Sequence, residues 1–145
     1  MKKQRGFTLV ELLIVFGIVA ALVGLTAAIS NTAITNSEFD RVADTLRGEL
    51  FAAQTDTIAG THDSAWGVAF NDNSIVRYKG ASYATRDQTF DLVTNFGNQV
   101  IISGADEVAF TRPYGIPVTS VEISIYDGMR HATATISHIG TIEIN

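Results

Sequence analysis

The stretch Arg5-Gly6-Phe7-Thr8-Leu9-Val10-Glu11-Leu12 decides the fold, because it opens an apolar run that continues to residue 29. Residues 7–29 contain one charge, Glu11, and no proline. A helix of this length can cross a hydrocarbon core of about 30 Å. The chain therefore begins with a segment that a small domain does not bury, and the carboxylate inside it needs an explanation.

Three kinds of N-terminal segment fit parts of this pattern. A cleaved secretory signal needs a shorter apolar core and a small-residue cleavage site, which Ala28-Ile29-Ser30 matches only weakly. An uncleaved signal anchor explains the length, and its preceding basic residues keep the N-terminus in the cytoplasm. That alternative does not explain Glu11, because a carboxylate at mid-membrane costs up to about 3 kcal/mol. It leaves Glu11 as a tolerated interfacial acid, since a position one turn inside the boundary costs less.

The third alternative uses all of these residues. A short basic leader, Gly6, Phe7 and Glu11 before an uninterrupted apolar helix resemble the start of type IV prepilins and type II secretion pseudopilins. The resemblance implies that a prepilin peptidase cuts between Gly6 and Phe7, N-methylates Phe7 and removes only residues 1–6. The leader charges are Lys2, Lys3 and Arg5.

The resemblance also implies a role for Glu11 in subunit assembly, as the partner of the Phe7 amine of a neighbouring subunit. In an apolar filament core each charge alone is strongly disfavoured, so the pair is the more stable state for both. A charge pair is also directional, so it can set axial register, as buried polar residues do in coiled coils.

Residues 30–60 are expected to continue the helix as an amphipathic segment. Its apolar stripe consists of Phe39, Val42, Ala43, Leu46, Leu50, Ala53 and Ile58, at spacings of three to five. This stripe predicts that one face packs on a globular domain. Asn31, Asn36 and Ser37 mark a candidate break or second N-cap, and Gly60 is predicted to end the helix.

After Gly60 the apolar period changes to two, which predicts short antiparallel strands over residues 61–145. The expected strands are 66–70, 75–78, 88–92, 99–102, 107–110, 121–126, 130–136 and 141–144. Asp72 and Asn73 are assigned to a tight turn, although oxygen side chains so placed could also indicate calcium. Trp66 and the strand phenylalanines are predicted to be core residues. The loop 112–117 is a candidate subunit contact.

The strand region resembles the minor pseudopilin H family, which includes the FimT-like minor pilins. The residues that carry this resemblance are Trp66-Gly67-Val68-Ala69-Phe70, Phe110 with Gly115, and Ile136 with Gly140 and Ile142. It implies an all-β domain of two sheets. The expected fold class is therefore α+β: a long N-terminal transmembrane and amphipathic helix, followed by an antiparallel, type IV pilin-like β domain.

The charge of the chain bears on its partners. The net charge is −5, and removing the +3 of the leader leaves −8. Nucleic acid is not an expected partner, because binding it needs a basic patch and Arg130 with His131 does not make one. A DNA-binding minor pilin for DNA uptake stays an alternative, as does a major pilin.

The sequence contains no catalytic signature. Cysteine is absent, and the three histidines have no metal-ligand spacing. His62-Asp63-Ser64 is adjacent in sequence, whereas catalytic triads meet in space, so this stretch is predicted to be a polar loop. We expect no catalytic site, no cofactor and no metal, and a membrane-anchored enzyme is the remaining alternative class.

The sequence thus predicts a structural subunit of a pilus or pseudopilus, most simply a minor one. The expected regions are a cleaved leader (1–6), a membrane and filament-core helix (7–29), its amphipathic continuation (30–60) and a β domain (61–145). The expected location is the cytoplasmic membrane, with the β domain outside, and then an extracytoplasmic filament. The expected partners are other pilins, the prepilin peptidase, the inner-membrane assembly platform and the lipid bilayer.

Overall fold

The computed structural model describes residues 8–145, and it describes the side chains of residues 8–23 and 38–145. One long helix, α1 (Leu9–Ala59), precedes two 3-10 helices, η1 (Thr61–Asp63) and η2 (Tyr83–Thr85). The strands are β1 (Trp66–Asn71), β2 (Ser74–Lys79), β3 (Asp87–Asn95), β4 (Ile101–Gly104), β5 (Glu107–Thr111), β6 (Ile116–Pro117), β7 (Val121–Tyr126), β8 (His131–Ile136) and β9 (Ile142–Ile144). The chain divides into two compact units, Met1–Asn36 and Ser37–Asn145.

α1 runs through the predicted break, so the expectation of a second N-cap at Ser37 is wrong. No proline interrupts the backbone hydrogen bonds there. Glu38, which follows the expected cap, instead accepts hydrogen bonds from the Arg41 guanidinium and the Gly97 N–H. The predicted stop at Gly60 is confirmed, because Gly60 adopts a left-handed conformation with φ 67°.

In the part of the chain that the structure describes, no helix is long and apolar enough to cross a membrane. The predicted span over residues 7–29 lies partly outside that part, since residue 7 and the side chains of 24–29 are not described. It stays a prediction.

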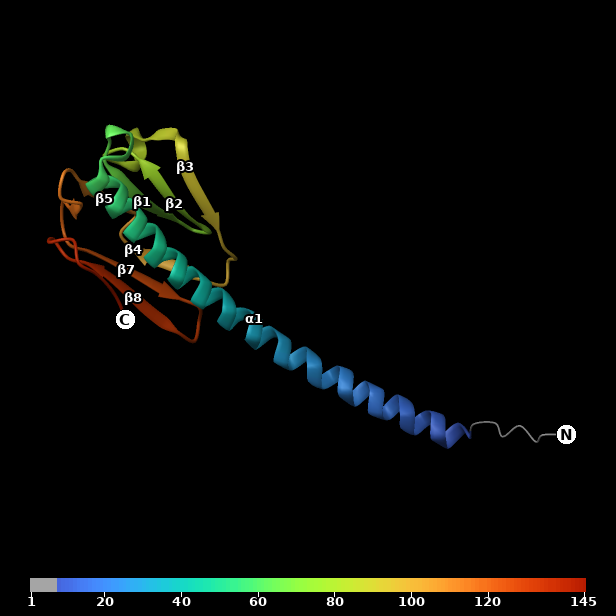
Figure 1. Ribbon diagram of the computed structural model, residues 1–145. Helices are drawn as coiled ribbons and strands as arrows, with labels where there is room; N and C mark the ends of the chain where they lie inside the picture. Colours follow the sequence, from blue (N-terminus) through green and yellow to red (C-terminus); the bar gives the residue numbers. More distant parts are fainter. Residues whose placement is uncertain (1–7) are drawn as a thin grey trace. The chain divides into compact units, whose positions relative to one another are not determined.

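The predicted all-β domain of two sheets is confirmed. A five-stranded antiparallel sheet has the order β3-β2-β1-β5-β6, and a four-stranded antiparallel sheet has the order β4-β7-β8-β9 (Figure 1). The predicted tight turn is confirmed as well, because Asn71 of β1 pairs with Ser74 of β2 and leaves Asp72 and Asn73 as the two-residue turn of this hairpin. Three details differ: β3 extends to Asn95, β4 covers Ile101–Gly104 where residues 99–102 were expected, and the loop 112–117 contributes the short strand β6.

One face of α1 packs against strands of both sheets (Figure 1). Its buried residues are Phe39, Val42, Leu46, Leu50, Ala53 and Thr57. The strand residues in the same core are Trp66, Val68, Ile75, Val108, Phe110, Ile123, Ile125, Ala134 and Ile136. Leu46 and Leu50 are fully buried, and each contributes about 2 kcal/mol by removal from water.

The prediction that Ile58 lies on this buried face is wrong, because its side chain is 56% exposed. Thr57 is fully buried instead. Position 57 follows Ala53 by four residues and stays on the stripe, whereas position 58 turns away from it. Ile58 was predicted to lie on the buried face because isoleucine is apolar, although its position along the helix is not on that face.

Thr57 is tolerated in the core because its hydroxyl is fully used. Its Oγ1 donates to the Ala53 carbonyl at 2.8 Å and accepts the Trp66 N–H at 2.9 Å. It thereby joins the last turn of α1 to the first residue of β1. Trp66 is buried, as predicted, and its indole N–H donates to the Thr61 carbonyl at 3.0 Å.

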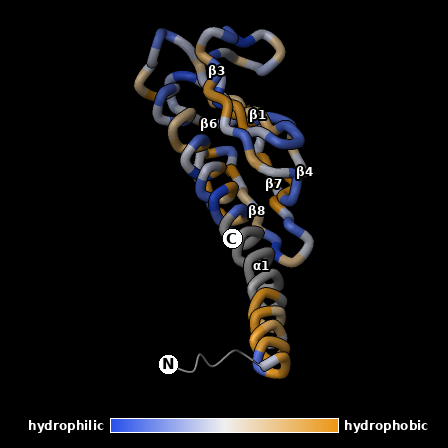
Figure 2. The backbone as a smooth tube through the Cα atoms, turned by 90° about the vertical axis from the view of Figure 1, so that its right-hand side faces the viewer, coloured by the Kyte–Doolittle hydropathy of each residue, from blue (hydrophilic) through white to orange (hydrophobic). Residues whose placement is uncertain are grey.

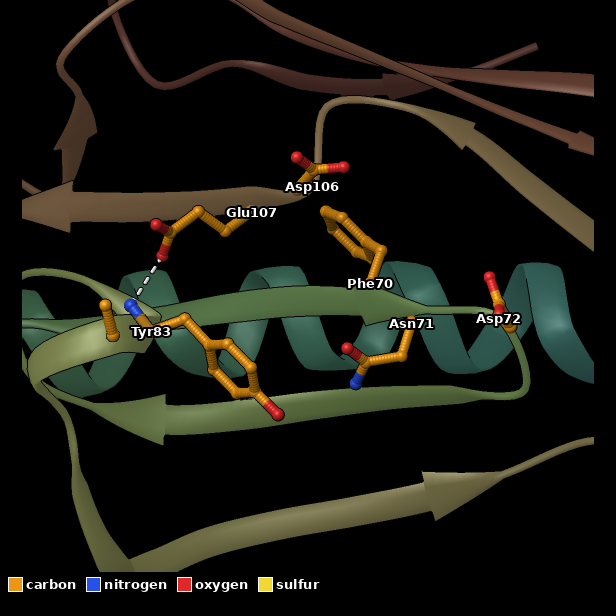
Figure 3. Close-up of a pocket in the computed structure, with 7 residues that line it drawn as sticks. Phe70, Asn71, Asp72, Tyr83, Asp106 and Glu107 are labelled. Atoms are coloured by element: carbon orange, nitrogen blue, oxygen red, sulfur yellow. Dashed lines mark hydrogen bonds between the residues drawn. The ribbon is translucent and has the colours of Figure 1, made fainter.

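Gly67 of β1 leaves room for a side chain of the neighbouring strand. The Tyr78 ring crosses this glycine, and its hydroxyl donates to the Glu107 carboxylate on β5. Glu107 also accepts the Tyr83 N–H at 2.7 Å, which fastens η2 to the sheet (Figure 3). Burial, reinforced by Glu107, raises the pKa of Tyr78 and keeps its phenol protonated as a donor.

We predict that Gly67→Ala lowers the free energy of unfolding by about 1–3 kcal/mol. The added methyl would lie 2.5 Å from the Tyr78 ring and 2.8 Å from the Val108 carbonyl oxygen. Gly48→Ala is the matched control, because this exposed glycine of α1 has nothing within 4 Å of the added methyl. It should stabilise the chain by about 0.5–1 kcal/mol. Denaturant unfolding of the chain in detergent measures both, and equal effects would contradict the close approach.

We predict that Thr57→Val lowers the free energy of unfolding by about 1–3 kcal/mol, because the Trp66 N–H loses its acceptor in the core. Thr57→Ser keeps the hydroxyl and removes one methyl, at a cost of about 0.8 kcal/mol. Thermal unfolding, followed by Trp66 fluorescence, ranks the two variants. A valine variant as stable as the serine variant would show that this hydrogen bond contributes nothing net.

Candidate assembly interface

The first described segment of α1 exposes an apolar surface on all its sides. Every residue from 8 to 23 is exposed, and Figure 2 shows this stretch as almost entirely hydrophobic. The large apolar residues are Leu9, Val10, Leu12, Leu13, Ile14, Val15, Phe16, Ile18, Val19, Leu22 and Val23. A helix that is apolar on every side is stable only in a bilayer or in contact with other helices.

Glu11 is the one charged residue of this exposed segment. Its backbone N–H donates to Thr8 Oγ1 at 3.3 Å, and the Leu12 N–H donates to the Thr8 carbonyl at 3.2 Å. Thr8 is therefore the N-cap of α1, and Glu11 occupies the third helical position. A carboxylate is favoured there, because the helix dipole places positive charge at this end.

This local arrangement gives a physical reason for Glu11 at this position that is independent of the predicted pairing between subunits. The sequence analysis did not single out Thr8. A signal was present, since threonine followed by glutamate three residues later is the pattern of a capping box. The two explanations are compatible, because the cap uses the backbone N–H of Glu11 and leaves its carboxylate exposed.

The other predicted site residues lie outside the described residues. They are the leader charges Lys2, Lys3 and Arg5, and the cleavage and methylation residues Gly6 and Phe7. Their roles stay predictions. The structure does place the helix start directly after them, at Leu9.

Within the second unit, polar contacts join α1 to both sheets. Arg77 of β2 lies between two acids of the helix, with Nε 3.0 Å from Glu49 and Nη1 2.6 Å from Asp56. Gln54 Nε2 donates to the carbonyls of Gly115 at 2.9 Å and Gly140 at 2.7 Å. The Arg77 pairs are partly buried, so water and salt screen them less than they screen exposed pairs.

Arg130 joins the β7–β8 turn to α1. Its Nε lies 3.1 Å from Asp127, its Nη1 lies 3.0 Å from Asp40, and its guanidinium lies over the Phe39 ring. Asp127 accepts the backbone N–H groups of Arg130 and Met129. Arg130 is thus engaged by two carboxylates within the chain, and it adds no support to the DNA-binding alternative.

The other polar candidates do not come together as a catalytic group in the described structure. Asp63 pairs with Arg112 at 2.6 Å, and the His62 ring packs edge-on against Phe90 with centroids 4.5 Å apart. In the loop 112–117, Tyr114 is 75% exposed, and Gly115 lies against the Ile58 side chain. That loop stays a predicted contact for another subunit.

We predict that Asp127 contributes stability that is lost in acid. The N–H groups of Arg130 and Met129, aided by the Arg130 guanidinium, lower the pKa of Asp127 from its ordinary value of 3.8. This stability is present above the unfolded pKa, near 3.8, and is lost as pH falls through the lower folded pKa.

Asp127→Asn should therefore be less stable than the unchanged chain at neutral pH and should lose less stability on acidification below about pH 4. Asp44→Asn is the control, since Asp44 is exposed on α1. Denaturant unfolding at a series of pH values measures the difference. Parallel pH dependence of the Asp127 variant and the unchanged chain would contradict the prediction.

Comparisons with known proteins agree with an N-terminal apolar helix followed by a β domain of two sheets. Residues 1–27 match the family described as the prokaryotic N-terminal methylation motif. Type II secretion system protein H of Pseudomonas aeruginosa is 28% identical over 81 residues, which cover 56% of this chain and 47% of that protein. The chain thus matches about half the length of this relative.

A solved structure has a similar fold. The minor pseudopilin EpsH from the type 2 secretion system of Vibrio cholerae superposes with a TM-score of 0.57 at 12% identity. The superposition covers 74% of this chain and 96% of that one. The chain therefore begins with a prokaryotic N-terminal methylation motif, shares the fold of a minor pseudopilin and is similar in sequence to type II secretion system protein H.

Proposed function

We propose that this chain is a structural subunit, of the minor pseudopilin H kind, in a type II secretion pseudopilus or a type IV pilus. One observation carries the proposal: the helix from residue 8 to residue 23 is exposed and apolar on all sides, with Glu11 as its one charge. The match of residues 1–27 to the N-terminal methylation motif supports it.

The proposal explains how the apolar surface is covered at each stage. Before assembly the bilayer covers it, as the length of the run 7–29 allows. After assembly the helices of neighbouring subunits cover it, and Glu11 pairs with the methylated amine of Phe7 on a neighbour. Each of these charges alone is costly in an apolar filament core.

Processing and topology follow from the same residues. The prepilin peptidase recognises the basic leader on the cytoplasmic side and cuts between Gly6 and Phe7. The positive charges before the apolar run keep the N-terminus inside and place the β domain outside. The inner-membrane assembly platform then moves the subunit into the filament. In this role the chain is a substrate of an enzyme and performs no catalysis itself.

Two parts of the proposal rest on the similar proteins: that the subunit is minor, and that the filament is a secretion pseudopilus. The similarity to type II secretion system protein H and the fold shared with the minor pseudopilin EpsH support a minor subunit over a major pilin. They also favour a secretion pseudopilus over a pilus. The acidic β domain fits contacts with other protein subunits better than contacts with nucleic acid.

Mass spectrometry of sheared filaments and of membranes tests the proposal through the N-terminal peptide. A peptide that begins with N-methylated Phe7, at low abundance relative to another pilin, is the expected result. Methylated Phe7 in the dominant filament protein would make this chain the major subunit. An intact Met1, or a terminus near Asn31, would overturn the proposal.

We predict that Glu11→Ala leaves export and cleavage unchanged but lowers incorporation into filaments at least tenfold, about 1.4 kcal/mol. The fraction of processed protein in the sheared material measures it. Glu143→Ala is the matched control, because it removes an exposed carboxylate from β9.

Glu11→Gln separates the two roles of this residue. Glutamine at the third helical position still supports the helix start but carries no charge. Incorporation as poor as that of the alanine variant is expected. Normal incorporation of the glutamine variant would show that the charge pair is not needed and that Glu11 acts by starting the helix.

A further inference from the structure

The second half of α1 turns one side away from the β domain. Strands of both sheets cover the opposite side, which carries the buried stripe (Figure 1). On the uncovered side, exposed residues follow one another at alternating spacings of four and three: Asp44, Gly48, Phe51, Thr55 and Ile58. Residues so spaced share one face of a helix, and this alternation is the pattern by which two helices pack along each other. These five residues are the outer stripe.

Gly48 has no use within the chain itself. A methyl group added at this position would have nothing within 4 Å, so no crowding inside the domain requires a glycine. Glycine in the interior of a helix nevertheless costs about 1 kcal/mol relative to alanine. Small residues on a helix surface let a second backbone approach closely, as they do between the helices of membrane proteins. Gly48 therefore points to a contact from outside the chain.

The outer stripe also carries exposed apolar side chains. Phe51 is 48% exposed and Ile58 is 56% exposed, whereas the other large apolar residues between 38 and 59 are buried. Two such side chains are too few to hold a protein partner alone, since a stable interface buries about 800 Å² on each side. The outer stripe can serve only as an addition to a larger contact of the same helix.

Arg47 borders the outer stripe and forms no ion pair among the described residues. Every other lysine and arginine from residue 8 onwards does pair with an acid: Arg41, Arg77, Lys79, Arg86, Arg112 and Arg130. Arg47 is exposed and directly precedes Gly48. Charges that flank an apolar helix contact set the register and orientation of the partner helix. The domain thus leaves one cation available beside the place of closest approach.

We propose that the outer stripe receives an α-helix of a neighbouring filament subunit, with the two backbones closest at Gly48 and a carboxylate of the partner opposite Arg47. The occupant is a helix because the exposed residues have the spacing of a helix–helix contact. The exposed apolar run 8–23 belongs to the same helix. A contact through the outer stripe adds to a contact through that run, so neither has to hold the partner alone. The identity of the partner rests on the proposed function.

Site-specific photo-cross-linking tests the contact directly. The probe, p-benzoylphenylalanine, replaces Phe51 in the full chain, expressed together with its filament partners. It replaces Tyr126 of β7 as the matched control, since that ring is 45% exposed. The expected product joins position 51 to the N-terminal helix of another pilin-type subunit, at least tenfold above any product of position 126. No product, equal yields from the two positions, or a product that joins position 51 to a strand or loop would overturn the proposal.

Substitution of Gly48 separates stability from assembly. Gly48→Ala and Gly48→Leu should keep the fold, because an added methyl meets nothing within 4 Å and both residues favour a helix over glycine. The leucine variant should still enter filaments at least tenfold less well, because its side chain holds the partner backbone away, and the alanine variant should fall between it and the unchanged chain. Thr135→Leu is the control, since it adds an exposed leucine on β8. Unchanged incorporation of both Gly48 variants would contradict the close approach.

The charge at position 47 provides an independent arm. Arg47→Glu should lower cross-linking from position 51 at least tenfold, because it places like charges opposite each other. Arg47→Lys should keep the cross-link, since lysine carries the same charge. Both variants should fold, because Arg47 is exposed. Equal cross-linking by the two variants would show that no carboxylate of the partner faces this position.

The outer stripe and the proposed function fail in different ways. If filaments contain the chain with methylated Phe7 but position 51 gives no helix product, only the outer stripe is wrongly assigned. If position 51 gives a helix product while Met1 is retained, the outer stripe does bind a helix and the filament role fails.

Discussion

The buried stripe of α1 between Phe39 and Thr57 is the constraint on which the β domain depends. The five-stranded and the four-stranded sheet share one hydrophobic core. The buried stripe contributes side chains of α1 to that core. The helical spacing of three and four residues determines which of its side chains enter that core. Polar contacts then hold the helix in register, through Thr57 to β1, Gln54 to two loop carbonyls and Arg77 to two helix acids. A change of register would break all of them at once.

α1 combines two kinds of surface that need different environments. From residue 38 onwards the chain itself covers the stripe of α1 that contains Phe39, Leu46 and Leu50, whereas Phe51 and Ile58 stay exposed. From residue 8 to residue 23 the apolar surface is exposed all round, so a bilayer or other helices must cover it. The hydrophobic effect therefore drives folding of the β domain, and it also disfavours contact of the exposed apolar run with water. In the proposed filament, Glu11 would need a cation beside it, because a carboxylate in an apolar environment is costly when unpaired.

The acidic character of the domain is unevenly distributed. Arginines neutralise acids where α1 meets the sheets, and there the pairs serve the fold. Asp72 and Asp106, by contrast, are exposed and make no ion pair among the described residues.

The amino-acid sequence by itself determined the elements that depend on local pattern. These are the apolar run with Glu11, the stop at Gly60, the Asp72-Asn73 turn and most strands, because periodicity and turn chemistry act over a few residues. Thr8 followed by Glu11 has the pattern of a capping box and so marks the start of the candidate assembly helix, although Thr8 was not among the predicted site residues. Only the tertiary structure decided that Tyr78 crosses Gly67 to reach Glu107, and that Gln54 reaches the carbonyls of Gly115 and Gly140. Each of these depends on contacts between residues distant in sequence, and no local pattern specifies which strand lies beside which.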